Sequence, residues 1–211
     1  MLLLLNATGA DSSFSLIMLK LLKKCWIKIN KNSMGMKSNK CLLVIDAQNG
    51  IFDLTPPLFK ADTVLTNVRQ LVENARMKDV PVVFVQHCGN IGSLFEKGTD
   101  GWQIHKSLSP AKNDYRIEKK YPDSFRETNL NELLKKLGIG KLVICGVVTE
   151  GCIDTTIRRA ASLGYKIETP SDAHSTTDSP ILKAEQIIAH HNEVFKIFSD
   201  VKSTVEISFD K

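Results

Sequence analysis

The sequence predicts an α/β protein in which a mainly parallel sheet of about six strands lies between two helical layers, a three-layer α/β/α sandwich. Two observations predict this fold. Short, continuously apolar runs rich in β-branched residues alternate along the chain with longer segments of helical periodicity. Strands of that composition are buried on both faces, which is typical of parallel sheets whose crossover helices cover both sides.

The expected strands are short and apolar, and turn-forming residues separate them. They cover residues 41–46, 80–86, 115–119, the run that begins at Lys141, 165–169 and 194–198. In such sheets ligands bind at the carboxyl ends of the strands. Asp46, His87 and Cys152 each follow or end such a run, so we expect them at one edge of the sheet.

The expected helices show apolar residues at helical spacing on one face. They cover residues 62–78, 129–137, the segment from Cys152 to the glycine stop at Gly164, and 180–191. Asp62 or Thr63 can cap the first of them, and Pro180 falls in the first turn of the last. Residues 88–114, around Trp102 and His105, form a long polar segment that we expect to be a functional loop at the rim of a site.

Cys152 lies where a buried run breaks at glycine and a helix begins. The positive end of a helix dipole lowers the pKa of a thiol and favours the nucleophilic thiolate. The alternative interpretation is a buried structural cysteine, and this local context does not separate the two. A thiol nucleophile needs a proton acceptor and a positive charge nearby, and Asp46 is the natural acid. The alternative for Asp46 is a capping or turn residue.

The 211 residues predict one domain, residues 40–205, preceded by an extension over residues 1–39. The cysteines do not form a disulfide framework, because they are odd in number and lie mostly in or beside apolar runs; a cytoplasmic protein is expected. They are Cys25, Cys41, Cys88, Cys145 and Cys152. Residues 1–40 hold seven lysines and Asp11, so their net charge is +6. The whole chain has a net charge of +5, so the remaining residues carry −1. A domain this close to neutral predicts no nucleic-acid partner.

The extension itself admits two interpretations. Residues 14–31 place leucines and lysines on opposite sides of a possible amphipathic helix that would lie on a membrane surface. The alternative, which we favour, is a disordered or untranslated stretch with the true start at Met34 or Met36. The apolar runs are too short to span a bilayer, and a secretory signal fits poorly because the charges do not precede them.

Several motifs, in order, resemble the isochorismatase-like cysteine hydrolases. DAQNGIF follows the first strand, RIEKKYPDSFRETNL resembles the family's lysine segment, and GVVTEGCIDTTIRRAASLGYKI resembles its cysteine segment. SDAHSTTD and QIIAHHN are similar to segments of the streptothricin-hydrolase-like branch. No GxGxxG, GxxxxGK[ST] or GxSxG motif competes with this interpretation. The resemblance covers about residues 40–200.

The resemblance implies an Asp-Lys-Cys triad, which falls on Asp46, Lys119 and Cys152. Lys119 precedes Phe125 by six positions as in the family, and the adjacent Lys120 is its competitor. The resemblance also implies a cis peptide bond at Val147–Val148, with the backbone N–H groups of Val148 and Cys152 as oxyanion donors. The implied activity is hydrolysis of a small-molecule amide or related C–N bond through a thioester. The alternative is a catalytically idle relative that binds a ligand or partner.

Two differences from the family's motifs indicate which branch of the family this chain resembles. The region IFDLTPPLFKAD lacks the histidine of the nicotinamidase metal site, so we expect no metal and no other cofactor. True isochorismatases are expected to carry glycine where this chain has Cys152. The resemblance also implies a homo-oligomer, a dimer or tetramer.

The remaining candidates have weaker signals. Gln48, Phe52, His87, Trp102 and Phe125 are tentative substrate-binding residues, each with a structural alternative. We interpret His174 as a capping or solvent-exposed residue. His190 and His191 end a helix, where histidine is favourable to the dipole, and we interpret them as structural.

Overall fold

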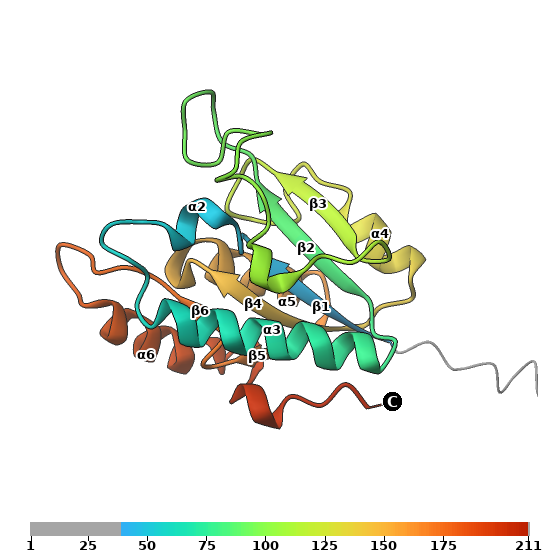
Figure 1. Ribbon diagram of the computed structural model, residues 1–211. Coiled ribbons are helices and arrows are strands. Elements are labelled where there is room, and N and C mark those ends of the chain that lie inside the picture. Colours follow the sequence, from blue (N-terminus) through green and yellow to red (C-terminus); the bar gives the residue numbers. More distant parts are fainter. Residues whose placement is uncertain (1–38, 211) are drawn as a thin grey trace, which may run out of the picture. The chain divides into compact units, whose positions relative to one another are not determined.

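The computed structural model describes residues 39–210. Predictions that fall on residues 1–38, including the amphipathic segment 14–31, lie outside the described residues. The sheet is entirely parallel, with the order β3-β2-β1-β4-β5-β7 and a short β6 that pairs with β4 (Figure 1). The strands are β1 (Lys40–Ile45), β2 (Val82–His87), β3 (Tyr115–Lys119), β4 (Lys141–Val147), β5 (Lys166–Pro170), β6 (His174–Ser175) and β7 (Asp200–Lys202).

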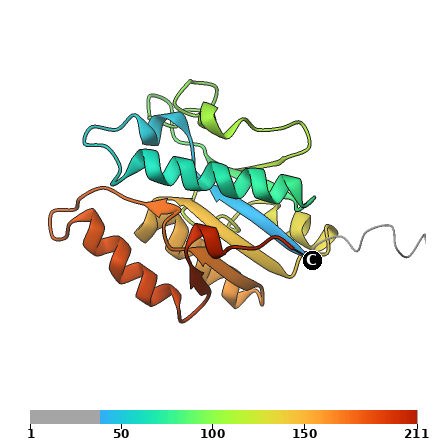
Figure 2. The same ribbon diagram turned by 60° about the horizontal axis from the view of Figure 1, so that its bottom comes forward.

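Helices cover both faces of the sheet, which confirms the predicted fold class (Figures 1 and 2). They are α2 (Asn49–Phe52), α3 (Ala61–Met77), α4 (Leu130–Lys136), α5 (Asp154–Ser162) and α6 (Ala184–Phe195). Alternate residues of β1 point to opposite faces. Leu42 and Val44 pack with α3, whereas Leu43 and Ile45 pack with α4 and α5. Within the described residues, no helix is both long and apolar enough to cross a membrane.

The last third of the chain differs from the prediction in two places. The strand predicted at 194–198 is wrong, because α6 continues to Phe195 and the final strand is β7. Phe195 lies two helical turns after Ile187, and both are buried, so the apolar run belongs to a helix face. Residues 180–183 precede the helix, because the side chain of Asp178 accepts the N–H of Ala184 at 2.9 Å and fixes the start there.

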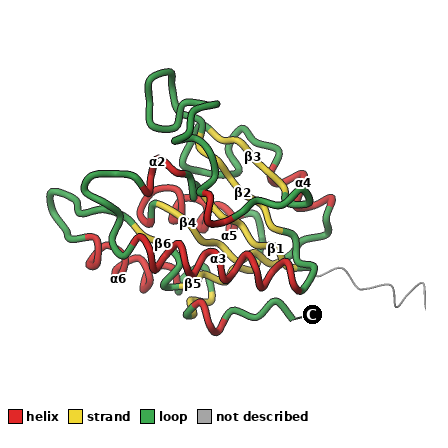
Figure 3. The backbone as a smooth tube through the Cα atoms, in the orientation of Figure 1, coloured by secondary structure: helices red, strands yellow, loops and turns green. Residues whose placement is uncertain are grey.

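The long loop between β2 and β3 is tied to the end of β1. His105 N donates to Ala47 O at 2.8 Å, and Asn49 N donates to Gln103 O at 2.8 Å. The first half of the loop extends past the carboxyl ends of β2 and β3, as the tube in Figure 3 shows. This arrangement places the loop beside the edge of the sheet where Asp46, His87 and Cys152 lie.

Candidate active site

The carboxyl ends of β1, β3 and β4 lie at the same edge of the sheet and bring Asp46, Lys119 and Cys152 together. Asp46 follows β1, Lys119 ends β3, and Cys152 lies in the turn after β4. The Nζ of Lys119 lies 2.7 Å from Asp46 Oδ2 and 3.1 Å from Cys152 Sγ, and it donates to Tyr121 O at 3.2 Å. All three N–H bonds of the ammonium group therefore have an acceptor.

Strand alternation separates the two adjacent lysines. Lys119 is 2% exposed and points toward Asp46 and Cys152, whereas Lys120 is exposed. Burial by itself lowers the pKa of Lys119, but its interactions with the Asp46 carboxylate and the Cys152 sulfur outweigh burial and raise the pKa above its ordinary value. Lys119 therefore keeps its positive charge between the carboxyl group of Asp46 and the thiol of Cys152.

The thiol of Cys152 does not have the low pKa predicted from its position at a helix start. Burial, and next the carboxylate of Asp46, raise the pKa of Cys152 to about 12, and Lys119 offsets only part of this rise. The prediction was wrong because it weighed the helix dipole without the burial and the neighbouring carboxylate. The resting group is a neutral thiol. Asp46 Oδ1 is buried and has no hydrogen-bond partner among the described residues, so it is open to accept a proton.

The cysteine turn, residues 147–153, connects β4 to α5. The Val147–Val148 peptide bond is cis, and residues 149–153 form one wide turn of helix that leads directly into α5. Gly146, just before the turn, has φ +121°, and a Cβ there would lie 2.0 Å from Ile45 O. Only glycine lets β4 pass this close to the end of β1, where Asp46 follows.

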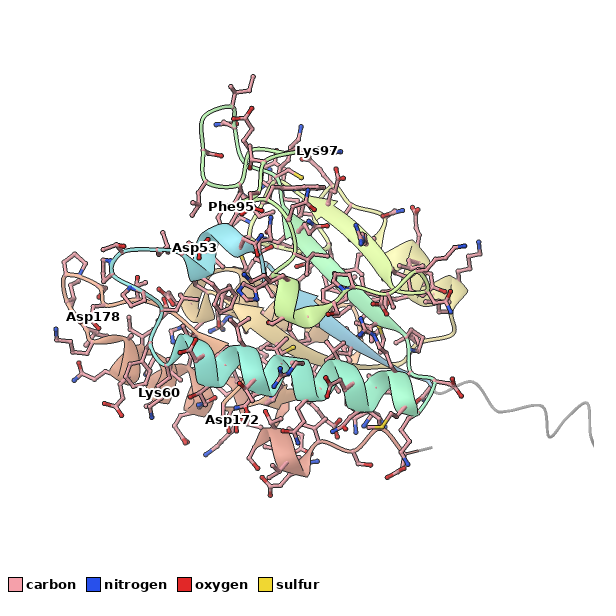
Figure 4. All side chains as sticks on the ribbon, in the orientation of Figure 1. Asp53, Lys60, Phe95, Lys97, Asp172 and Asp178 are labelled. Carbon is pink, nitrogen blue, oxygen red and sulfur yellow. The ribbon has the colours of Figure 1, made fainter. Side chains whose placement is uncertain are left out.

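His87 lies beside Lys119, its register partner on the neighbouring strand. Burial, and next the charge of Lys119, lower the pKa of His87, so the ring is neutral. Its Nδ1 is buried without a partner, and its ring meets Phe95 edge-on at 5.6 Å. Figure 4 shows Phe95 and Lys97 on the loop after β2. A cavity of about 770 Å³ is lined by His87, Phe95 and Lys97 among others.

Gln48 is fully buried, and its amide is occupied by main-chain groups. Its Nε2 donates to His87 O at 3.0 Å and to Trp102 O at 2.8 Å, and its Oε1 accepts the N–H of His87 at 2.8 Å. Gln86 adds a second bond to Trp102 O at 3.0 Å. Gln48 thus joins the ends of β1 and β2 to the long loop.

The three aromatic candidates lie in different surroundings. Phe52 is half-buried and packs against His105, with ring centroids 5.4 Å apart. The indole N–H of Trp102 donates to Cys88 Sγ at 3.2 Å, and both residues belong to the long loop between β2 and β3. Phe125 is buried in the core and stacks on Tyr165, with ring centroids 6.0 Å apart.

Two features of the site escaped the sequence analysis. His174 is 1% exposed, so its interpretation as a capping or solvent-exposed residue is wrong; it bonds to Thr149 in the cysteine turn. Thr176 donates to Glu150 in the same turn at 2.8 Å. The SDAHSTTD segment was visible in the sequence, but its partners lie in a distant segment. Among residues 39–210, no three His, Cys, Asp or Glu side chains converge as metal ligands.

The fold and the site together define a parallel α/β protein with a thiol site at the carboxyl edge of its sheet. Residues 40–201 match the family described as the isochorismatase domain, so the chain belongs to the isochorismatase family. The resemblance inferred from the motifs is thereby confirmed.

Known relatives place the chain within this family. Over 141 residues it is 34% identical to a streptothricin hydrolase from Streptomyces noursei, an alignment that covers 67% of this chain and 51% of that protein. The chain therefore spans about half the length of that relative. A crystal structure of an isochorismatase family protein is 38% identical, with a TM-score of 0.75, and the match covers 79% of this chain and 99% of the other. N-carbamoylsarcosine amidase from Thermoplasma acidophilum is 26% identical, with a TM-score of 0.67 and coverage of 80% and 98%.

Proposed function

We propose that the protein is a cysteine-dependent hydrolase that cleaves an amide or related C–N bond of a small molecule through a thioester on Cys152. One observation carries the proposal: the ammonium group of Lys119 touches both Asp46 and Cys152 at the edge of a parallel sheet. A buried carboxylate, cation and thiol in mutual contact are the parts that an activated nucleophile requires. The amidase and the hydrolase among the relatives support the same class of reaction.

The first step begins from a neutral thiol, because the pKa of Cys152 is raised to about 12. Asp46 Oδ1, which lacks a partner among the described residues, takes the thiol proton as Sγ attacks the carbonyl carbon. The developing sulfur anion stays next to the Lys119 ammonium, which remains protonated throughout. Coupling proton removal to attack avoids a free thiolate beside a carboxylate.

The tetrahedral intermediate places a negative charge on the former carbonyl oxygen. We assign the backbone N–H groups of Val148 and Cys152 as its donors, as the resemblance implies. When the intermediate collapses, Asp46 returns its proton to the leaving nitrogen, and an amine or ammonia departs. Water then attacks the thioester, again with Asp46 as the proton acceptor, and the acid product leaves with the thiol restored.

We propose that the substrate binds in a cavity on the β3 side of the site. The smaller of two neighbouring cavities, about 240 Å³, is lined by Lys119 and Tyr121 among others. We propose that the substrate contacts the neutral ring of His87 and the loop that carries Phe95. We assign Gln48 and Phe125 supporting roles, since the first is bound to main chain and the second lies in the core. The homo-oligomer and the cytoplasmic location stay predictions from the sequence.

A panel of small amides and ureas tests the proposal, with release of ammonia or amine as the measurement. Wild-type protein should turn over at least one member, and Cys152→Ala should abolish this turnover. Cys41→Ala, which removes a buried thiol from the middle of the fold, serves as the matched control and should retain it. Turnover that persists in Cys152→Ala would refute the mechanism. A chain that hydrolyses no amide and no activated ester would favour the catalytically idle alternative.

A further inference from the structure

A buried histidine outside the proposed triad is bonded to the cysteine turn. His174 lies on β6, and its Nδ1 is 2.9 Å from the hydroxyl of Thr149, the residue that begins the wide turn of helix carrying Cys152. Its Nε2 is 3.0 Å from Oδ1 of Asn192 on α6. Thr149 is itself fully buried, so neither group has water as an alternative partner.

The donor and the acceptor of each of these hydrogen bonds can be assigned. Asn192 Nδ2 donates to Ser171 O at 3.1 Å, which turns Oδ1 of the amide toward His174. The His174 proton therefore sits on Nε2, and Nδ1 accepts the hydroxyl proton of Thr149. Burial lowers the pKa of His174 to about 4, so the ring is neutral near pH 7 and one tautomer satisfies both neighbours.

The same segment also holds the turn through other bonds. Gly146 N donates to Ala173 O at 3.0 Å, and β6 pairs with the end of β4. Thr176 donates to Glu150 Oε1 at 2.8 Å. Residues 173–176 therefore line the cysteine turn from its entry to Glu150, and the His174–Thr149 bond lies between the other two contacts.

We propose that His174 is a positioning residue for acyl transfer at Cys152. Through Thr149 it fixes the cysteine turn, and with it the N–H groups of Val148 and Cys152, against the oxygen of the attacked carbonyl. This inference rests on the proposed function. Oxyanion donors lose most of their effect when they are displaced by a fraction of an ångström to an ångström. The thiol is less dependent on His174, because Lys119 and the buried Ile153 hold it independently.

Two reagents separate these effects. Hydrolysis of p-nitrophenyl acetate passes through an oxyanion, whereas alkylation by iodoacetamide displaces iodide at carbon and forms none. His174→Phe keeps a ring against Phe195, which His174 meets edge-on at 5.5 Å, and removes both hydrogen bonds. We expect kcat for the ester to fall about 10- to 100-fold, with KM and the alkylation rate of Cys152 within about twofold.

His191→Phe is the matched control. His191 also packs against Phe195, at 5.7 Å, but its Nδ1 bonds to Ile187 O, within its own helix. This variant should leave kcat within about twofold of wild type. His174→Asn should recover part of the lost kcat, because its amide oxygen can again accept the Thr149 hydroxyl.

Thr149→Val tests the same bond from the other side and carries the test if His174→Phe does not fold. It should lower kcat as His174→Phe does, and the double variant should be no worse than either single one. Thr169→Val, which removes a buried hydroxyl bonded to Ser199, is the control and should have no effect.

The outcomes are distinct from those that test the proposed function. Ester hydrolysis that is unchanged in Cys152→Ala would refute the proposed function itself. Hydrolysis that depends on Cys152 but is unchanged in Thr149→Val and His174→Phe would overturn the positioning role alone. Equal losses of hydrolysis and alkylation, or an equal loss in His191→Phe, would reduce His174 to a structural residue and overturn it as well.

Discussion

Lys119 holds Asp46 and Cys152 in one hydrogen-bonded set, at 2.7 Å from a carboxylate oxygen and 3.1 Å from the sulfur. The side chain of Lys119 is fully buried and that of Asp46 is 7% exposed. Each charge is therefore tolerated only because the other is present, since an unpaired buried ion costs several kcal/mol. The reactive group and the stability of this edge of the sheet depend on the same pair.

Replacement of Lys119 by Met should destabilise the protein by about 3 kcal/mol, because it leaves the buried carboxylate of Asp46 unpaired. Urea unfolding followed by circular dichroism measures this change. Lys120→Met is the matched control, because Lys120 is exposed and takes part in no ion pair among the described residues; it should change the stability by less than about 0.5 kcal/mol. Equal losses in the two variants would contradict the pairing.

Asp46→Asn should separate reactivity from catalysis. The carboxylate raises the pKa of Cys152, so its removal should lower that pKa and speed iodoacetamide alkylation at pH 8. Hydrolysis should instead fall about 100-fold or more, because the proton acceptor is gone. The rate of Cys152 alkylation, measured by peptide mapping at pH values from 7 to 11, gives the shift of the Cys152 pKa directly. If alkylation slows together with hydrolysis, Asp46 does not oppose the thiolate.

Gly146→Ala should be severely destabilising, by at least about 3 kcal/mol, because φ is positive and a Cβ would meet Ile45 O at 2.0 Å. Gly138→Ala is the matched control. Gly138 also has positive φ, at +72°, but open space surrounds its Cβ position, so only about 1 kcal/mol should be lost. Thermal unfolding of both variants measures the two losses of stability. Similar losses would show that the close approach of β1 and β4 is not the reason that position 146 requires glycine.

Local pattern was a good guide wherever an element is determined by its own residues. The strands predicted at 41–46, 80–86 and 115–119 correspond to β1, β2 and β3 within two residues. It failed at 194–198, where an apolar run has the same composition as a strand but continues the buried face of α6. Periodicity over five residues does not separate these two cases.

Sequence pattern alone predicts the parallel α/β fold and places Asp46, Lys119 and Cys152 at or after the carboxyl ends of three strands, because both follow from the order of short apolar runs. The neutral state of the thiol needed the three-dimensional structure, since burial and a carboxylate from another strand outweigh the helix start beside it. The three-dimensional structure also decided the partner of His174. That bond joins the segment after β5 to the turn after β4, and such a contact depends on how the strands are paired in space rather than on local sequence.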